Sequence, residues 1–262
     1  MQRSVSAQLT LQVAAPARLA FIVAVASRPP AERLHLRHDG EAIEPREVTD
    51  AAGTRIHVVD VAPGTVTLDY GATVDGRADE ASGTELELLE YLRPSRYGEA
   101  DRLAPTAHAE FAGLAGADLL AAVSSWVGTR LSYVPGSSQP TDGAVQTLLA
   151  GQGVCRDYAH LVIGLLRALD VPARLAAVYA PGLDPMDFHA VAEAHVDGAW
   201  HVVDATTLAP RSTLVRIATG RDAADTAFLS SYGGNVTLES MLVTAIADEL
   251  PDDDVTRLVR LG

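Results

Sequence analysis

The spacing of apolar residues changes once along this chain, and that change limits the folds it can adopt. From residue 1 to about residue 92, apolar and polar residues alternate in short runs such as residues 5–13, with turn-forming residues between the runs. Alternation with a period of two is typical of β-strands that bury one face. After residue 105, apolar residues recur every three or four positions, as in residues 117–131, which predicts amphipathic helices. We therefore expect an α+β protein.

Three parts follow from these patterns. Residues 1–92 are expected to form an antiparallel β-sandwich-like domain. Residues 93–105 contain two prolines, a glycine and charges of both signs, which indicates a connector. Residues 106–262 are expected to form an α+β domain, in which helices over 117–131, 144–150 and 155–169 precede strands.

Composition excludes several classes of function. The formal net charge of −14 argues against nucleic-acid and anionic-membrane partners, which require positive surface. Every basic residue is arginine, so Schiff-base chemistry and an ordinary P-loop, which both need lysine, are excluded. No apolar run approaches the roughly 18 residues of a membrane helix, and the N-terminus alternates like a strand instead of resembling a signal peptide. A single cysteine fits a reducing compartment, so we expect a cytoplasmic protein.

That cysteine, Cys155, follows Gly-Gln-Gly-Val at the predicted start of a helix. There its sulfur would lie beside unpaired backbone N–H groups and the positive end of the helix dipole. Both favour the thiolate, which is the nucleophilic form, and the same N–H groups could hold an oxyanion. A lone cysteine is otherwise a small buried hydrophobic residue, so the choice depends on finding a base.

A predicted hairpin supplies the base. Asp197-Gly198 is a strong signal for a two-residue turn between two alternating runs. If these two residues form the turn, His189 and Asp204 become diagonal neighbours on one side of the sheet, roughly 5–8 Å apart. A carboxylate at that distance can orient an imidazole, fix its tautomer and stabilise its charged form. A longer loop would shift the register by one residue and separate the two side chains.

The remaining histidines of this region fit other roles. His195 would face Trp200 at the far end of the hairpin, and His201 would point to the opposite side of the sheet. We interpret both as packing or surface residues. His160 lies one and a half turns after Cys155, so its ring is expected to point away from the sulfur and to support the hairpin.

A zinc site is the competing use of these residues. His189, Glu193 and His195 share one face of the predicted strand, and Cys155 could join them. However, the two histidines are separated by roughly 20 Å along an extended strand, which one metal ion cannot span. We therefore expect no metal site.

The order of these residues along the chain, a cysteine at the start of a helix and then His and Asp on a hairpin, is similar to that of a known family of proteins. The segments GVCRDYAHLVIGLLRALDVPARLAAVYA and HAVAEAHVDGAWHVVDAT resemble the transglutaminase-like superfamily, in particular bacterial members described as cysteine proteases. Residues 91–103 and 216–234 also resemble bacterial members that carry an N-terminal β-region. Two positions depart from the common pattern, because Val191 replaces an aromatic residue and Ala205 replaces a proline.

The resemblance implies a papain-like or transglutaminase-like α+β catalytic core that needs no cofactor. Cys155 would be the nucleophile, His189 the base and acid, and Asp204 the orienting carboxylate. The oxyanion hole would include the backbone N–H of Cys155, with Gln152 as a side-chain candidate. Two further residues are candidates for the wall of the substrate site, namely Tyr133 and Asp157, although Asp157 also fits a helix-dipole partner.

Three functions remain open. The first is a cysteine hydrolase that acts on a peptide or amide substrate, which could belong to a protein. The second is an amine-dependent transglutaminase, in which an amine instead of water resolves the acyl-enzyme. The third is a catalytically silent protein-binding module on the same fold. The sequence does not decide the oligomeric state.

Overall fold

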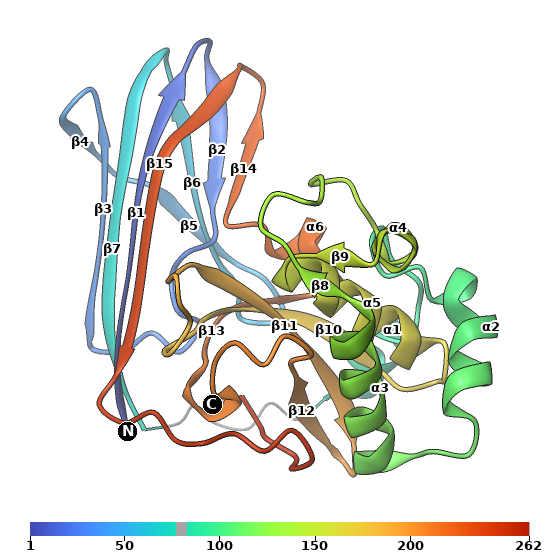
Figure 1. Ribbon diagram of the computed structural model, residues 1–262. Helices are drawn as coiled ribbons and strands as arrows, with labels where there is room; N and C mark the ends of the chain where they lie inside the picture. Colours follow the sequence, from blue (N-terminus) through green and yellow to red (C-terminus); the bar gives the residue numbers. More distant parts are fainter. Residues whose placement is uncertain (77–82, 262) are drawn as a thin grey trace.

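The chain folds into two lobes, and a computed structural model describes them for residues 1–76 and 83–261. Figure 1 shows a β-sandwich beside a lobe in which helices pack against a separate sheet. The α+β class expected from the sequence is confirmed. The predicted β domain of residues 1–92 includes residues 77–82, which lie outside the described residues.

Two antiparallel sheets form the sandwich. Their strands are β1 (Gln2–Val13), β2 (Ala17–Phe21), β3 (Ala31–His38), β4 (Glu41–Ile43), β5 (Arg46–Thr49), β6 (Arg55–Val61), β7 (Gly64–Asp75), β14 (Leu229–Tyr232) and β15 (Val236–Ala247). One sheet has the order β15-β1-β7-β3-β4 and the other has the order β14-β2-β6-β5. Side chains of β1 alternate between exposed and buried along the strand, as the two-residue period of the sequence predicts.

The C-terminal part of the chain corrects the expected domain boundary. We expected residues 106–262 to form one unit, but β15 pairs with β1 and β14 pairs with β2. The sandwich is therefore completed by strands that follow the second lobe in sequence. Beyond β15 the chain returns to that lobe, where the Val202 N–H donates to the carbonyl of Val259.

The second lobe contains one four-stranded antiparallel sheet, the two-stranded sheet of β8 and β9, and all the helices of the described residues. Its elements are α1 (Glu85–Glu90), α2 (Ala100–Phe111), α3 (Gly116–Arg130), β8 (Ser132–Tyr133), α4 (Ala144–Ala150), β9 (Gln152–Gly153), α5 (Cys155–Arg167), β10 (Ala173–Tyr179), β11 (Phe188–Val196), β12 (Ala199–Val203), the 3-10 helix η1 (Arg211–Thr213), β13 (Val215–Gly220) and α6 (Ala223–Thr226). The sheet order is β12-β11-β10-β13. The predicted helices correspond to α3, α4 and α5 within one or two residues.

Helix α5 lies at the centre of this lobe. Residues 157–167 are all buried, and the helix packs against α2, α3, α4 and strand β11. Burial on every side fixes the position of its first residue, Cys155.

In the described part of the chain no single helix is long and apolar enough to span a membrane, although α2 and α3, bent by 107°, meet the length and composition requirement as a pair.

The expected connector is more ordered than its composition suggests. Helix α2 begins at Ala100, inside residues 93–105. The guanidinium of buried Arg167, at the end of α5, donates to the carbonyl of Arg93 at 3.1 Å and to the hydroxyl of Ser95 at 2.9 Å. The connector is thus attached to the central helix.

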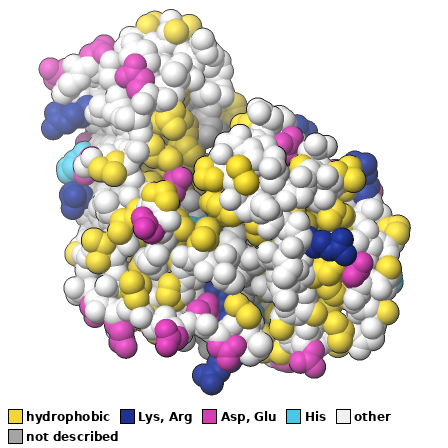
Figure 2. All heavy atoms as spheres, viewed as in Figure 1, with side chains coloured by type: hydrophobic (Ala, Val, Ile, Leu, Met, Phe, Trp, Pro, Cys, Tyr) yellow, Lys and Arg dark blue, Asp and Glu magenta, His cyan; other side chains and the backbone are white. Residues whose placement is uncertain are grey.

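The sandwich packs directly against the end of the second sheet. The hydroxyl of Tyr179, at the end of β10, donates to the carbonyl of Val23 at 2.8 Å. Phe188, the first residue of β11, stacks on Phe228 with ring centroids 5.1 Å apart. Hydrophobic side chains gather where the lobes meet (Figure 2).

Candidate active site

Cys155 is the first residue of α5 and is half-buried. The preceding strand β9 pairs with β8 in parallel, which places Gly153 opposite Tyr133. Gly151 ends α4 in the left-handed region with φ 66°, where a side chain would be strained. A Cβ on Gly153 would lie 2.7 Å from the Cβ of Asp157, so this position requires glycine. The backbone therefore requires glycine at both positions, Gly151 because of its positive φ and Gly153 because Asp157 lies so close.

Of the two roles expected for Asp157, its full burial fits the partner of the helix start and does not fit the wall of a substrate site. Its side chain is fully buried and accepts the N–H of Val154 at 2.8 Å, just before the helix begins. It also accepts from the Ser138 hydroxyl and from Arg156. The loop that precedes α4 folds over this carboxylate, so Asp157 fixes the start of α5 instead of contacting a ligand.

The hairpin of β11 and β12 has the predicted register. Val196 pairs with Ala199, and His195 pairs with Trp200. Asp197 and Gly198 have φ values of 51° and 79°, as a two-residue turn of the primed type requires. The register puts His189 and Asp204 within reach of each other at the open end of the hairpin.

His189 and Asp204 form a buried pair. The distance between His189 Nε2 and Asp204 Oδ2 is 2.8 Å, and both side chains are almost fully buried. The second carboxylate oxygen of Asp204 accepts from the backbone N–H and the hydroxyl of Thr206 at 2.9 and 2.7 Å. Every oxygen of this buried anion is therefore satisfied.

The charge of His189 is set by its surroundings. Burial lowers the pKa of His189, but Asp204 and, to a smaller extent, Cys155 outweigh this effect and raise it to about 10. Burial raises the pKa of Asp204, but the charge and hydrogen bond of His189 outweigh it, so that pKa is lowered overall. The pair is therefore ionised at neutral pH. Because Nε2 is bonded to Asp204, Nδ1 is the ring nitrogen left for the thiol of Cys155.

Tyr133 lies beside Cys155. It is 40% exposed, and its hydroxyl interacts with both the backbone and the side chain of Cys155. Partial burial raises the pKa of Tyr133 to about 12, with further contributions from Cys155 and Asp187. The phenol is therefore a neutral hydrogen-bond donor at physiological pH. Gln152 is exposed on β9, and its part in an oxyanion hole stays a prediction.

The other histidines do not approach the thiol. His195 is half-buried and packs edge-on against Trp200 with ring centroids 5.3 Å apart. His160 is fully buried, but it does not support the hairpin as expected. Its Nε2 accepts the N–H of Ala223 at 3.1 Å, and its ring stacks on Tyr97. The described residues include no group of three or more His, Cys, Asp or Glu side chains arranged to hold a metal ion.

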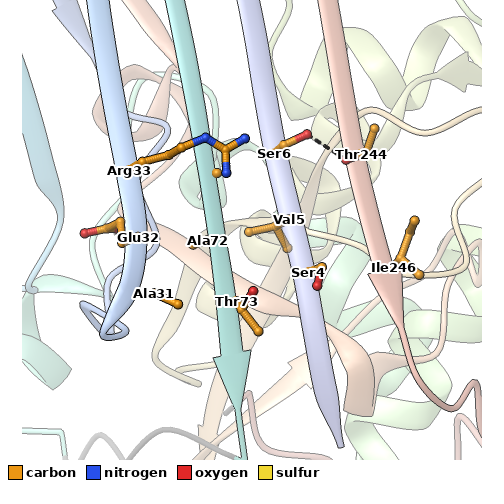
Figure 3. A pocket seen from close by; sticks show the side chains of 11 residues that line it. Ser4, Val5, Ser6, Ala31, Glu32, Arg33, Ala72, Thr73, Thr244 and Ile246 are labelled. Carbon is orange, nitrogen blue, oxygen red and sulfur yellow. Dashed lines mark hydrogen bonds between the residues drawn. The ribbon is translucent and has the colours of Figure 1, made fainter.

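A hollow on the sandwich is separate from these residues. It has a volume of about 440 Å³ and is lined from β1, β3, β7 and β15, where Ser6 and Thr244 on the neighbouring strands β1 and β15 are hydrogen-bonded to each other (Figure 3). Its lining includes neither Cys155 nor His189. The chemistry-bearing residues therefore lie at the start of α5 and not in this hollow.

Comparison with known proteins identifies the family. The model of the transglutaminase-like superfamily matches residues 109–205, a segment that includes Cys155, His189 and Asp204. A crystal structure described as that of "a Putative Cysteine Protease from Cytophaga hutchinsonii" shares 33% identity and a TM-score of 0.85, over 96% of this chain and 92% of that one. This chain belongs to the transglutaminase-like superfamily. The resemblance found in the sequence is thereby confirmed.

A match to a curated protein is shorter. The uncharacterized protein ML0607 of Mycobacterium leprae (strain TN) is 27% identical over 134 residues, which are 48% of this chain and 48% of that protein. This chain thus spans about half the length of that curated relative. The likeness to the Cytophaga protein, by contrast, includes the sandwich as well as the transglutaminase-like core.

One residue of the site escaped the sequence analysis. Asp187 lies two positions before His189, is exposed, and contributes to the raised pKa of Tyr133. Residues two apart in an extended segment point to the same side, so this spacing was the available signal. It was overlooked because Asp187 lies in the loop before β11 and not in the alternating run.

Proposed function

We propose that this transglutaminase-like chain is a cysteine hydrolase that acts by acyl transfer on a peptide or amide. The observation that carries the proposal is the buried His189–Asp204 pair at 2.8 Å, whose histidine pKa is also raised by Cys155, the first residue of a buried helix. An imidazolium held by a buried carboxylate stabilises a neighbouring thiolate, and the helix N-terminus adds to this effect. The chemistry requires no cofactor.

The reaction would proceed in two steps. The sulfur of Cys155 attacks the carbonyl carbon, and His189 gives its proton to the amine as the C–N bond breaks, which leaves a thioester on the enzyme. A water molecule then attacks the thioester carbonyl while His189 accepts its proton. The acid is released and the thiolate–imidazolium pair is restored. Asp204 keeps the ring oriented throughout and is not itself protonated.

Tyr133 is our candidate for the second donor of the oxyanion hole. Its hydroxyl already contacts Cys155, whose backbone N–H is the first donor. A carbonyl oxygen placed between these groups would accept from both.

We expect Tyr133→Phe to slow acylation of Cys155 by roughly 10- to 100-fold, because removal of one oxyanion donor weakens only steps that develop negative oxygen. Alkylation by iodoacetamide forms no oxyanion, so its rate should stay the same. The two rates are measured side by side on the same variant. Equal losses in both reactions would show that Tyr133 positions the thiol instead of stabilising an oxyanion.

The test of the function uses an active ester, so it needs no knowledge of the natural substrate. With p-nitrophenyl acetate at pH 6, the wild-type protein should release a burst of one p-nitrophenol per chain, followed by slower turnover. Cys155→Ala should give no burst, and His189→Ala should react no faster than a free thiol. A wild-type rate equal to that of a free thiol would favour the silent binding module and refute the proposal.

Amine transfer is the second candidate, and the same acyl-enzyme can decide it. A labelled primary amine added during ester turnover either captures the acyl group or leaves the product as the acid. Capture at low amine concentration would favour the transglutaminase reaction over hydrolysis.

A further inference from the structure

A second carboxylate borders the candidate site. Asp187 immediately precedes β11, and it lies on the same side of the chain as His189 because residues two apart in extended backbone share a face. The N–H of Phe188 donates to Asp187 Oδ1 at 2.7 Å, which fixes the carboxylate close to the backbone. Asp187 also interacts electrostatically with Tyr133, the residue that contacts Cys155. Its place two residues before His189 and its electrostatic effect on both His189 and Tyr133 put Asp187 near the entrance to the thiol.

The charge of Asp187 is not neutralised by an arginine. Within residues 1–76 and 83–261, the cation that influences its carboxyl is His189. That imidazolium is already paired with Asp204 at 2.8 Å. Arg156, next to Cys155 in sequence, is held by Asp157 at 3.0 Å. In the described residues no arginine pairs with Asp187, whose side chain reaches solvent although partial burial raises its pKa, whereas the buried carboxylates around it are paired.

We propose that Asp187 makes the entrance to Cys155 selective for substrates that carry a cation, an ammonium or guanidinium group, near the scissile amide. A charge-assisted hydrogen bond to such a group would orient the substrate carbonyl toward the thiol. The same charge would repel anionic substrates. This inference deepens the proposed function and rests on it for the identity of the reaction.

The single cysteine gives a direct probe of the charge at this entrance. Methanethiosulfonate reagents of similar size, one cationic and one anionic, are reacted with the protein at low salt. Each rate is divided by the rate with β-mercaptoethanol, which removes the intrinsic reactivity of the reagent. Because Cys155 is the only cysteine in the chain, no other residue contributes to the signal.

The wild-type protein should favour the cationic reagent, and Asp187→Asn should lower the cationic-to-anionic ratio by roughly three- to tenfold, as expected for one charge a few ångströms from the thiol. Asparagine can still accept the N–H of Phe188, so the loop is preserved while the charge is removed. Asp187→Glu should retain the preference. An effect of loop structure alone would not separate these two variants.

Asp118→Asn is the matched control. Asp118 is exposed in the first turn of α3, whereas β8 and Tyr133 follow the last turn, about 20 Å away along the helix axis. This variant changes the net charge by the same unit. If it altered the ratio as much as Asp187→Asn, the net charge of −14 and not a local site would be responsible, and the proposal would be overturned.

Substrate selection is tested with two esters of the same leaving group, p-nitrophenyl 4-guanidinobenzoate and its neutral 4-acetamidobenzoate counterpart. Wild type should be acylated faster by the cationic ester, and Asp187→Asn should lose that preference while its reaction with the neutral ester is kept. No change in preference would overturn the inference even if both esters react. Absence of any burst, with the thiosulfonate ratio intact, would instead refute the proposed function.

Discussion

Asp204→Ala is expected to slow the acylation of Cys155 by p-nitrophenyl acetate at pH 6 by about 100-fold or more. Without the carboxylate, burial lowers the pKa of His189, and only Cys155 and the more exposed Asp187 still oppose it. The ring is then neutral at pH 6 and no longer holds a thiolate beside it. It also loses the acceptor that fixes its orientation. The measurement is the rate of the p-nitrophenol burst.

Two further variants separate charge from orientation. Asp204→Asn keeps an oxygen that can accept the Nε2–H of His189, so its loss of rate should be smaller than that of Asp204→Ala. Asp222→Ala removes another buried carboxylate, which caps α6 by accepting the N–H of Ala224, and should leave the burst unchanged. A burst in Asp204→Ala within threefold of wild type would mean that His189 is activated by something else.

Glu193→Ala is expected to lower the free energy of unfolding by about 3–5 kcal/mol, because Arg216 loses its anion and Arg174 keeps only Glu87, 3.4 Å away. Glu193 is fully buried on β11, and its carboxylate binds Arg174 at 2.9 Å and Arg216 at 2.7 Å. Arg174 also lies over the ring of Trp200 at 3.9 Å. Urea unfolding of the variant and the wild type measures the difference.

The carboxyl group of Glu193 also predicts how the free energy of unfolding depends on pH. Burial raises the pKa of Glu193, but Arg216 and Arg174 outweigh this and lower it to about 2. Its contribution is therefore present above the usual glutamate range and is lost as the pH falls toward 2. Stability should decline over this acid range more steeply in wild type than in Glu193→Gln. Asp60→Ala, which breaks an exposed pair with Arg18, should not move the urea midpoint. Equal acid sensitivity in wild type and Glu193→Gln would contradict the assignment.

Local signals explain why the core of the site could be predicted from the sequence. Asp197-Gly198 specifies a primed turn by its backbone preferences, and the alternation of the flanking runs fixes the register. The proximity of His189 and Asp204 follows from that register alone. The start of α5 at Cys155 was likewise marked by local features, the glycines before it and the helical spacing after it.

The features that were missed depend on contacts between distant segments. Strand β15 pairs with β1, although the two strands are more than two hundred residues apart in the sequence. The local sequence pattern of β15 does not indicate which strand it pairs with. Asp157 is buried because Ser138 and the surrounding loop fold over it, which helical periodicity does not reveal. His160 could be placed away from the thiol, but its contact with Ala223 depends on how α6 docks.

The central claim is that Cys155 and His189 form a thiolate–imidazolium pair, and the pH dependence of Cys155 alkylation by iodoacetamide tests it most directly. A free cysteine is only about 0.3% thiolate at pH 6, so the pair should make wild type react roughly 30- to 100-fold faster than a free thiol at that pH, after allowance for the lower nucleophilicity of a stabilised thiolate. His189→Ala should lose this advantage and follow the profile of a free thiol. If wild type and His189→Ala react equally slowly at pH 6, the pair does not exist and the proposed acyl transfer falls with it.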